Sequence, residues 1–151
     1  MPRTDPMLEL DRFLPYRLSV LSNRISAAIA GDYAERFDLS VTEWRVLAIL
    51  GRAPGASASE VAERAAMDKV AVSRAVGSLL AAGRLKRSHH ANDRRRSVLS
   101  LSARGRRIYQ QIVPLALARE RVLRDALGSR DRAALERILA KLDAATTPPT
   151  D

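Results

Sequence analysis

The chain has 151 residues, of which 46% are apolar, which is enough for one domain with a hydrophobic core. It contains no cysteine, which excludes disulfides and thiolate metal sites, and no apolar run approaches the length of a membrane span. Because the first residues also lack the apolar stretch of a signal peptide, we expect a cytoplasmic protein. The formal charge is +9, and the segment from Arg84 to Arg107 holds nine basic residues and one acidic residue. Such a concentration of positive charge favours nucleic acid as a partner over a membrane.

Helical periodicity begins near residue 7 and continues to about residue 36, with apolar residues at spacings of three and four. Pro15 lies inside this stretch and predicts a helix start or a kink. Further along, Ser40 and Glu43 form an S-x-x-E capping box that predicts the start of a second helix. The apolar surface of that helix is wide, which indicates burial on most sides.

Two short helices are predicted next. Ser57 and Glu60 form another S-x-x-E box, which opens the first of them. Asp68 stands at the N-cap of the second helix and Gly83 at its end. Two short helices separated by about three or four residues are typical of a helix-turn-helix.

The second of these helices has two contrasting sides. At about 100° per residue, one side carries Val72, Val76, Leu79, Leu80 and Gly83, and should face the core. The opposite side is small and has no acid after Asp68. Its candidate DNA contacts are Lys69, Val70, Ala71, Ser73 and Arg74. Small residues let a helix enter the major groove, where arginine contacts guanine or phosphate, serine a base edge or phosphate, and an apolar group a thymine methyl. From this stretch alone, a plain packed surface helix remains the alternative.

A β-hairpin should follow, with strands at residues 85–90 and 97–102 and a tip at 91–96. Leu99 and Leu101 alternate with serines, which indicates a strand with one buried face. His89 and His90 are neighbours in a strand and point to opposite faces, so we expect no metal site there.

The predicted tip carries Arg94, Arg95 and Arg96 side by side. These like charges repel one another until phosphates lie between them, and a narrow minor groove favours inserted arginine. Asp93 is two residues from Arg95 and could orient that side chain. We therefore predict that the tip contacts DNA; a merely soluble turn is the alternative.

After the hairpin, helical periodicity returns from about residue 103 to 127 and again after a break at 128–132. The final residues, 147–151, are expected to form a disordered tail.

Together these segments resemble the MarR family of winged helix-turn-helix regulators, over about residues 14–142. The similar stretches are "SVTEWRVLAIL", "SASEVAERAAMDKVAVSRAVGSLLAAGRLKR" and "NDRRRSVLSLSARG". The resemblance implies a mainly α fold, with a small antiparallel hairpin as the wing. It implies a DNA-binding domain at 37–102 and dimerisation helices at 1–36 and 103–146.

The resemblance also assigns positions to individual residues. Arg74 holds the position of the family's arginine in the recognition helix, and Arg87 that of the arginine in the first strand. Asp93 and Arg95 hold the wing-tip positions. The triple arginine is richer than the family pattern, so Arg94 and Arg96 both remain candidates for DNA contact.

The function implied is that of a homodimeric, sequence-specific DNA-binding transcriptional regulator acting on a pseudo-palindromic operator. We expect a repressor that is released by a small aromatic or phenolic acid. Candidate ligand residues are Tyr16, Arg17, Arg24 and Trp44, since aromatic rings stack and arginine holds a carboxylate; Tyr16 and Trp44 as plain core residues are the alternative.

Other functions remain as alternatives. One is a non-specific architectural DNA-binding protein, and another is a winged helix used for protein contact. We predict no enzyme and no cofactor, because the chain has neither a Gly-rich phosphate loop nor a nucleophile elbow.

Overall fold

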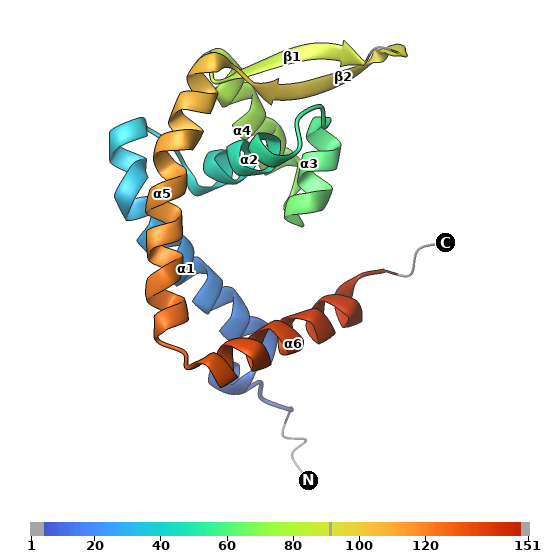
Figure 1. The fold of residues 1–151 in the computed structure, drawn as a ribbon. Coiled ribbons are helices and arrows are strands. Elements are labelled where there is room, and N and C mark those ends of the chain that lie inside the picture. Colours follow the sequence, from blue (N-terminus) through green and yellow to red (C-terminus); the bar gives the residue numbers. More distant parts are fainter. Residues whose placement is uncertain (1–4, 91, 149–151) are drawn as a thin grey trace. The chain divides into compact units, whose positions relative to one another are not determined.

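The computed structural model describes residues 5–90 and 92–148, without the side chains of His90 and Arg94 (Figure 1). Residues 149–151 of the predicted tail therefore lie outside the described part. In chain order the described elements are η1 (Leu10–Arg12), α1 (Leu14–Phe37), α2 (Val41–Arg52), α3 (Ala58–Ala65), α4 (Lys69–Ala81), β1 (Leu85–His90), β2 (Asp93–Leu101), α5 (Ala103–Asp125) and α6 (Ser129–Thr146). The predicted mainly helical fold with one antiparallel hairpin is confirmed. None of the described helices combines the length and hydrophobicity needed to cross a membrane.

The chain divides into two compact units, Met1–Leu115 and Ala116–Asp151. The first unit contains α1 to α4, both strands and most of α5. The second unit contains the end of α5 and all of α6.

Local signals set most helix boundaries as predicted. Pro15 falls in the first turn of α1, where its missing N–H costs nothing. At the start of α2 the Ser40 hydroxyl accepts from the Glu43 N–H, and the Glu43 carboxylate accepts from the Ser40 N–H, both at 3.1 Å. Asp68 caps α4 through the Ala71 N–H at 3.0 Å. Gly83 follows the end of that helix with a φ of +70°, which suits glycine.

The second predicted capping box is only half present. Ser57 accepts a hydrogen bond from the Glu60 N–H at 3.2 Å. The Glu60 carboxylate, however, forms an ion pair with Arg96 of β2 instead of returning to the Ser57 N–H. The prediction of a full box was wrong because a charged partner from elsewhere in the fold competes for that carboxylate.

The core of the first unit lies between α2, α3, α4 and the hairpin, and it includes residues of α1 and of the first part of α5. The largest fully buried side chains are Tyr33, Leu47, Leu50, Leu79, Leu99, Ile112, Val46, Val61, Val72 and Val76. Leu99 and Leu101 are buried while Ser100 is only partly so, which confirms the predicted alternation along β2. The hairpin is therefore anchored to the helices by one face of its second strand.

The second strand is longer than predicted. Pairing is regular from Leu85 opposite Leu101 to His89 opposite Ser97, and the next pair is His90 with Asp93. Arg94 to Arg96 thus have no partner in this register and form a bulge within β2. The prediction that these arginines form the turn was wrong, since all three lie within β2, after the pairing of His90 with Asp93.

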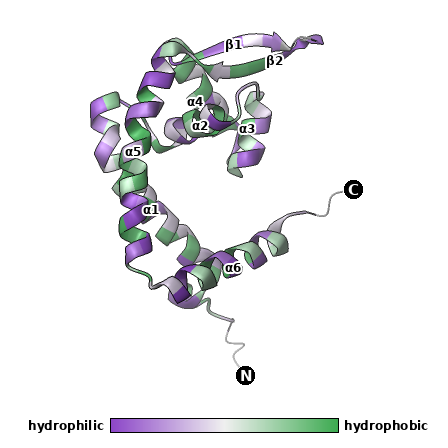
Figure 2. Ribbon diagram, in the orientation of Figure 1, coloured by the Kyte–Doolittle hydropathy of each residue, from purple (hydrophilic) through white to green (hydrophobic). Residues whose placement is uncertain are grey.

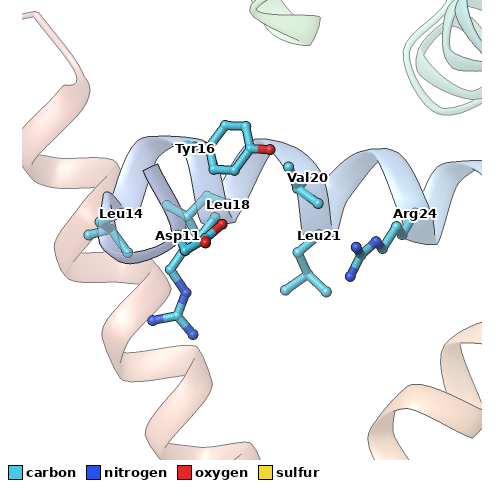
Figure 3. A pocket seen from close by; sticks show the side chains of 8 residues that line it. Asp11, Leu14, Tyr16, Leu18, Val20, Leu21 and Arg24 are labelled. Carbon is cyan, nitrogen blue, oxygen red and sulfur yellow. The ribbon is translucent and has the colours of Figure 1, made fainter. Parts of the chain in front are cut away.

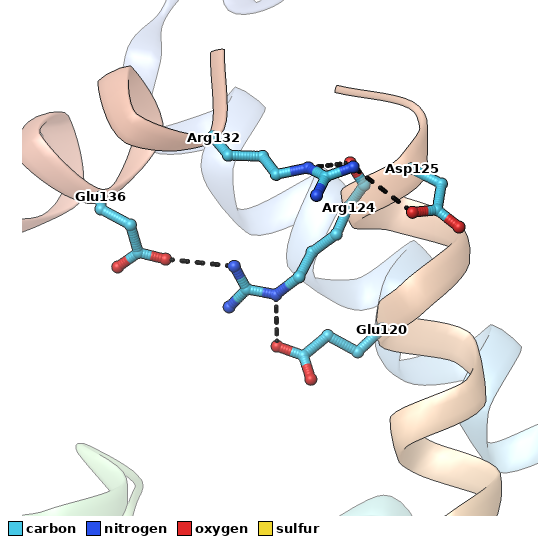
Figure 4. A network of polar contacts seen from close by, with 5 residues as sticks. All are labelled: Glu120, Arg124, Asp125, Arg132 and Glu136. Atoms are coloured by element: carbon cyan, nitrogen blue, oxygen red, sulfur yellow. Dashed lines mark hydrogen bonds and ion pairs between the residues drawn. The ribbon is translucent and has the colours of Figure 1, made fainter. Parts of the chain in front are cut away.

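In the second unit, ion pairs link the end of α5 to α6 (Figure 4). Arg124 lies between two carboxylates, 2.9 Å from Glu120 and 3.5 Å from Glu136. Arg132 contacts the Asp125 carboxylate at 3.3 Å and donates to the Arg124 carbonyl at 2.8 Å. No residue of α6 is buried in the single chain, although hydrophobic residues recur along this helix (Figure 2).

Candidate nucleic-acid interface

The two sides of α4 differ as predicted for Val72, Val76 and Leu79, but Leu80 is only partly buried and Gly83 is exposed. Val72, Ala75, Val76 and Leu79 are buried, whereas Lys69, Val70, Ser73, Arg74, Gly77 and Ala81 are exposed. Ala71 is partly exposed. Because the Asp68 carboxylate is engaged in the N-cap, the exposed side presents small residues and two cations.

The start of α2 supports α4 from the side. The second oxygen of the Glu43 carboxylate accepts from the Ser78 hydroxyl at 3.2 Å, so the capping box of α2 also contacts α4. A shallow hollow of about 330 Å³ lies here, lined by Ser40, Thr42, Glu43, Ala71, Arg74, Ala75 and Ser78. Arg74 thus lines a surface shared by the start of α2 and the length of α4 from Ala71 to Ser78.

The wing, defined as β1 and β2, carries the remaining DNA candidates. Arg87 donates to the Ser97 hydroxyl across the two strands at 3.1 Å. The Asp93 carboxylate accepts from the Arg95 backbone N–H at 3.0 Å. The prediction was that Asp93 orients the side chain of Arg95. Asp93 instead holds the backbone of Arg95, because the carboxylate reaches the nearer amide. Arg95 is exposed, and the side chain of Arg94 lies outside the described part.

Two arginines of the basic segment are engaged within the protein. Arg96 pairs with Glu60 of α3. Arg84 is only 8% exposed, and its guanidinium donates to the carbonyls of Phe37 and Asp38 at the end of α1. A helix C-terminus attracts a cation, which gives Arg84 a structural place. The sequence count of nine bases therefore overstates the charge available to a polyanion.

Three of the four predicted ligand residues lie together. Tyr16, Arg17 and Arg24 line a depression of about 500 Å³ on α1, together with Asp11, Leu14, Leu18, Val20 and Leu21 (Figure 3). In the figure Tyr16 and Leu21 project to different sides of the helix. Leu14, Leu18 and Leu21 are 41–54% exposed, so this surface is apolar as well as cationic.

Trp44 is not part of that depression. Its ring lies 5.8 Å from Tyr33 and 6.0 Å from Tyr109, between centroids. Trp44 and Tyr33 border a hollow of about 140 Å³, which is lined by Ser26, Ile29, Tyr33, Val41, Trp44 and Arg45. Arg45 donates to the Ser26 hydroxyl at 2.9 Å. Burial raises the pKa of the Tyr33 hydroxyl, and the charge of Arg45 opposes that shift.

Sequence analysis missed Tyr33 and Arg45 as companions of Trp44. Tyr33 is on α1 and Arg45 follows Trp44 on α2, so only the packing of the two helices brings the three together. No spacing within either helix indicates that contact.

Comparison with known proteins agrees with this geometry. Residues 37–96 match a family model described as MarR family. The chain is similar to the structure of a MarR/EmrR family transcriptional regulator from Acinetobacter sp. ADP1, with a TM-score of 0.82 and 25% identity over 91% of this chain and 97% of that one. A search of curated proteins gives no match.

Two further similar structures are of regulators whose partners are known. The transcriptional repressor CouR bound to a 23-mer DNA duplex has a TM-score of 0.74 and 26% identity, over 91% of this chain and 97% of that one. BpsR of Bordetella bronchiseptica, whose DNA binding is regulated by 6-hydroxynicotinic acid, has a TM-score of 0.78 and 22% identity, over 95% of this chain and 100% of that one. The helix pair, the wing and the match over residues 37–96 occur together in one chain, which is similar over these residues to the MarR family and over most of its length to the structures of winged helix-turn-helix transcriptional regulators of that family.

Proposed function

We propose that the chain is a homodimeric, sequence-specific DNA-binding regulator that acts as a repressor released by a small aromatic acid. The observation that carries this proposal is the exposed side of α4, which is small, carries Lys69 and Arg74, and has its one acid committed to the helix cap. Such a surface fits the major groove and its phosphates. The likeness to CouR, a repressor bound to a DNA duplex, supports the same partner.

The wing supplies the second DNA contact in this proposal. Arg95 is exposed, and its backbone is fixed by the Asp93 carboxylate. A fixed backbone lowers the entropy lost when the side chain enters a narrow minor groove. Arg87 is held across the strands by Ser97 and would approach phosphate nearer the base of the wing.

The exposed apolar residues of the terminal helices support dimerisation. They are Leu14, Leu18 and Leu21 on α1, Leu117, Val122 and Leu123 on α5, and Leu135, Ile138 and Leu139 on α6, each at least 41% exposed in the single chain. Apolar groups in such number at the surface indicate a protein–protein contact. We therefore assign residues 1–36 and 103–146 to dimerisation and 37–102 to DNA binding. A two-fold axis then requires a pseudo-palindromic operator.

The effector site is proposed at the hollow beside Trp44. Trp44 and Tyr33 offer ring faces, and Arg45 offers a cation for a carboxylate. The depression at Tyr16, Arg17 and Arg24 suits a partner helix better, because its leucines are exposed there. Regulation of BpsR by 6-hydroxynicotinic acid supports an aromatic acid as the ligand class. Such a ligand would act by binding better to the conformation that does not fit DNA.

Footprinting on the DNA around the gene, with binding measured over a range of salt, tests the proposal. We expect a protected palindrome and a steep salt dependence, with a specificity ratio of about 10³ or more over random DNA. Uniform protection would favour the architectural alternative. Binding that hardly responds to salt would favour a winged helix that contacts protein.

A further inference from the structure

Arg96 and Glu60 connect the outer part of the wing with α3. Arg96 lies in the bulge of β2, and Glu60 lies in the first turn of α3. Their side chains form an ion pair and are 49% and 31% exposed. The pair thus lies at the surface, with both groups partly shielded from water.

The Glu60 carboxylate pairs with Arg96 although a hydrogen bond within its own helix start is within its reach, as a second motif in the chain shows. Ser40–Glu43 and Ser57–Glu60 are the same S-x-x-E motif at the starts of two helices. Glu43 closes its box on the Ser40 N–H, whereas the Glu60 carboxylate is turned to the wing. Glu60 therefore forgoes a local hydrogen bond that its position offers, in exchange for a charged partner.

The outer part of the wing needs such a partner. The Leu99 backbone is joined to the segment before α3 by two hydrogen bonds of 2.8 Å, to Gly55 and Ala56. The hairpin extends past α3 as a two-stranded ribbon (Figure 1). Arg96 is three residues from Leu99 toward the outer end of the hairpin, which is about 10 Å along an extended strand. A two-stranded ribbon is only marginally stable by itself, so a second attachment at Arg96 restricts its swing.

We propose that Arg96 is a positioning residue which, through Glu60, holds the wing against α3, so that Arg95 and not Arg96 supplies the wing's contact with DNA. This inference rests on the proposed DNA-binding function for its effect, but the tether itself exists in the free protein. It divides the arginine cluster by role. Arg95 is exposed and its backbone is held by Asp93, whereas Arg96 forms an ion pair with an acid of its own chain.

The first test needs no DNA. Hydrogen exchange is measured by mass spectrometry on the parent and on Glu60→Gln, Arg96→Ala and Glu63→Gln. Glu63 is an exposed acid of the same helix, so its variant removes the same charge without touching the wing. We expect faster exchange in the peptide covering residues 92–98 for the first two variants only. Unchanged exchange in both would overturn the tether, and thermal melts confirm that each variant is folded.

The second test uses DNA affinity and its salt dependence, on the footprinted site and on a random-sequence duplex. We expect Arg96→Ala and Glu60→Gln each to weaken binding about two- to fivefold, as the loss of one exposed ion pair allows. The double variant should be no weaker than the weaker single variant, because both remove one interaction. Arg96→Ala should leave the salt slope unchanged, whereas Arg95→Ala lowers it by about one.

A different set of affinities would reject the positioning role of Arg96. If Arg96 is a phosphate contact for which Glu60 competes, Glu60→Gln tightens binding and Arg96→Ala lowers the salt slope. That outcome rejects the positioning role. If the parent protein shows no salt-dependent DNA binding, the proposed function fails instead, and the exchange measurement still decides whether the tether exists.

Discussion

Gly105 occupies a position in α5 where no side chain fits. A Cβ built on it would lie 1.9 Å from the carbonyl oxygen of Arg84 and 3.0 Å from the carbonyl carbon. The obstructing atoms are backbone, and the same oxygen accepts the Ser102 N–H at 3.1 Å. A backbone carbonyl cannot rotate away as a side chain can. Gly105→Ala must therefore push the segment around Arg84, between α4 and β1, away from α5.

The cost can be worked out from three contributions. Alanine gains up to about 1 kcal/mol over glycine inside a helix. Overpacking against the Arg84 backbone costs about 1–3 kcal/mol. Loss of the Ser102 hydrogen bond costs about 0.5–1.5 kcal/mol more. With the full gain from alanine subtracted, we expect the free energy of unfolding to fall by about 0.5–3.5 kcal/mol, which lowers the Tm by about 1–14 °C in a chain of this size.

Thermal unfolding followed by circular dichroism measures this shift. Gly77→Ala is the matched control, because it makes the same change within α4, where nothing lies within 4 Å of the added Cβ. We expect its Tm to equal or exceed that of the parent. A Gly105→Ala variant that melts at or above the parent temperature would refute the argument from close packing.

Three other substitutions test the assigned roles. Arg95→Ala should weaken binding to all DNA and lower the salt slope by about one, and an unchanged slope in a fluorescence anisotropy titration would contradict its phosphate contact. Arg74→Ala should cost about 1–3 kcal/mol on the operator and relax specificity at one position in each half-site; equal loss on random DNA would reduce it to a phosphate contact. Arg84→Met should lower the free energy of unfolding by about 1–3 kcal/mol, because two carbonyls at the end of α1 lose their donor. Urea denaturation measures that loss. A variant as stable as the parent would contradict the prediction and indicate that water donates to the two carbonyls in place of the guanidinium.

The features that could be predicted from the sequence are those with partners a few residues apart. The Ser40 box, the Asp68 cap and the helix end at Gly83 all follow from hydrogen bonds within one turn. The alternation of Leu99 and Leu101 with serines predicted a strand with one buried face, and burial confirms it. The two sides of α4 could also be predicted, because the helix repeat alone decides which residues share a face.

Features that depend on distant segments could not be predicted in this way. Glu60 has the same local motif as Glu43, but a wing arginine takes its carboxylate. Arg84 belongs to the basic segment by sequence and is buried under the end of α1 in the fold. Trp44 was grouped with Tyr16 and Arg24 by chemistry, whereas packing places it against Tyr33 and Tyr109.

The sequence by itself thus determined the kinds of elements, their order and the family resemblance, because these depend on periodicity and on bonds within a turn. Only the tertiary structure decided which charges remain available at the surface. An arginine side chain is long and has several donors, so its partner is whichever acceptor the fold brings within reach. Arg84 reaches the carbonyls at the end of α1 and caps that helix, whereas Arg96 reaches Glu60 and links the wing to α3.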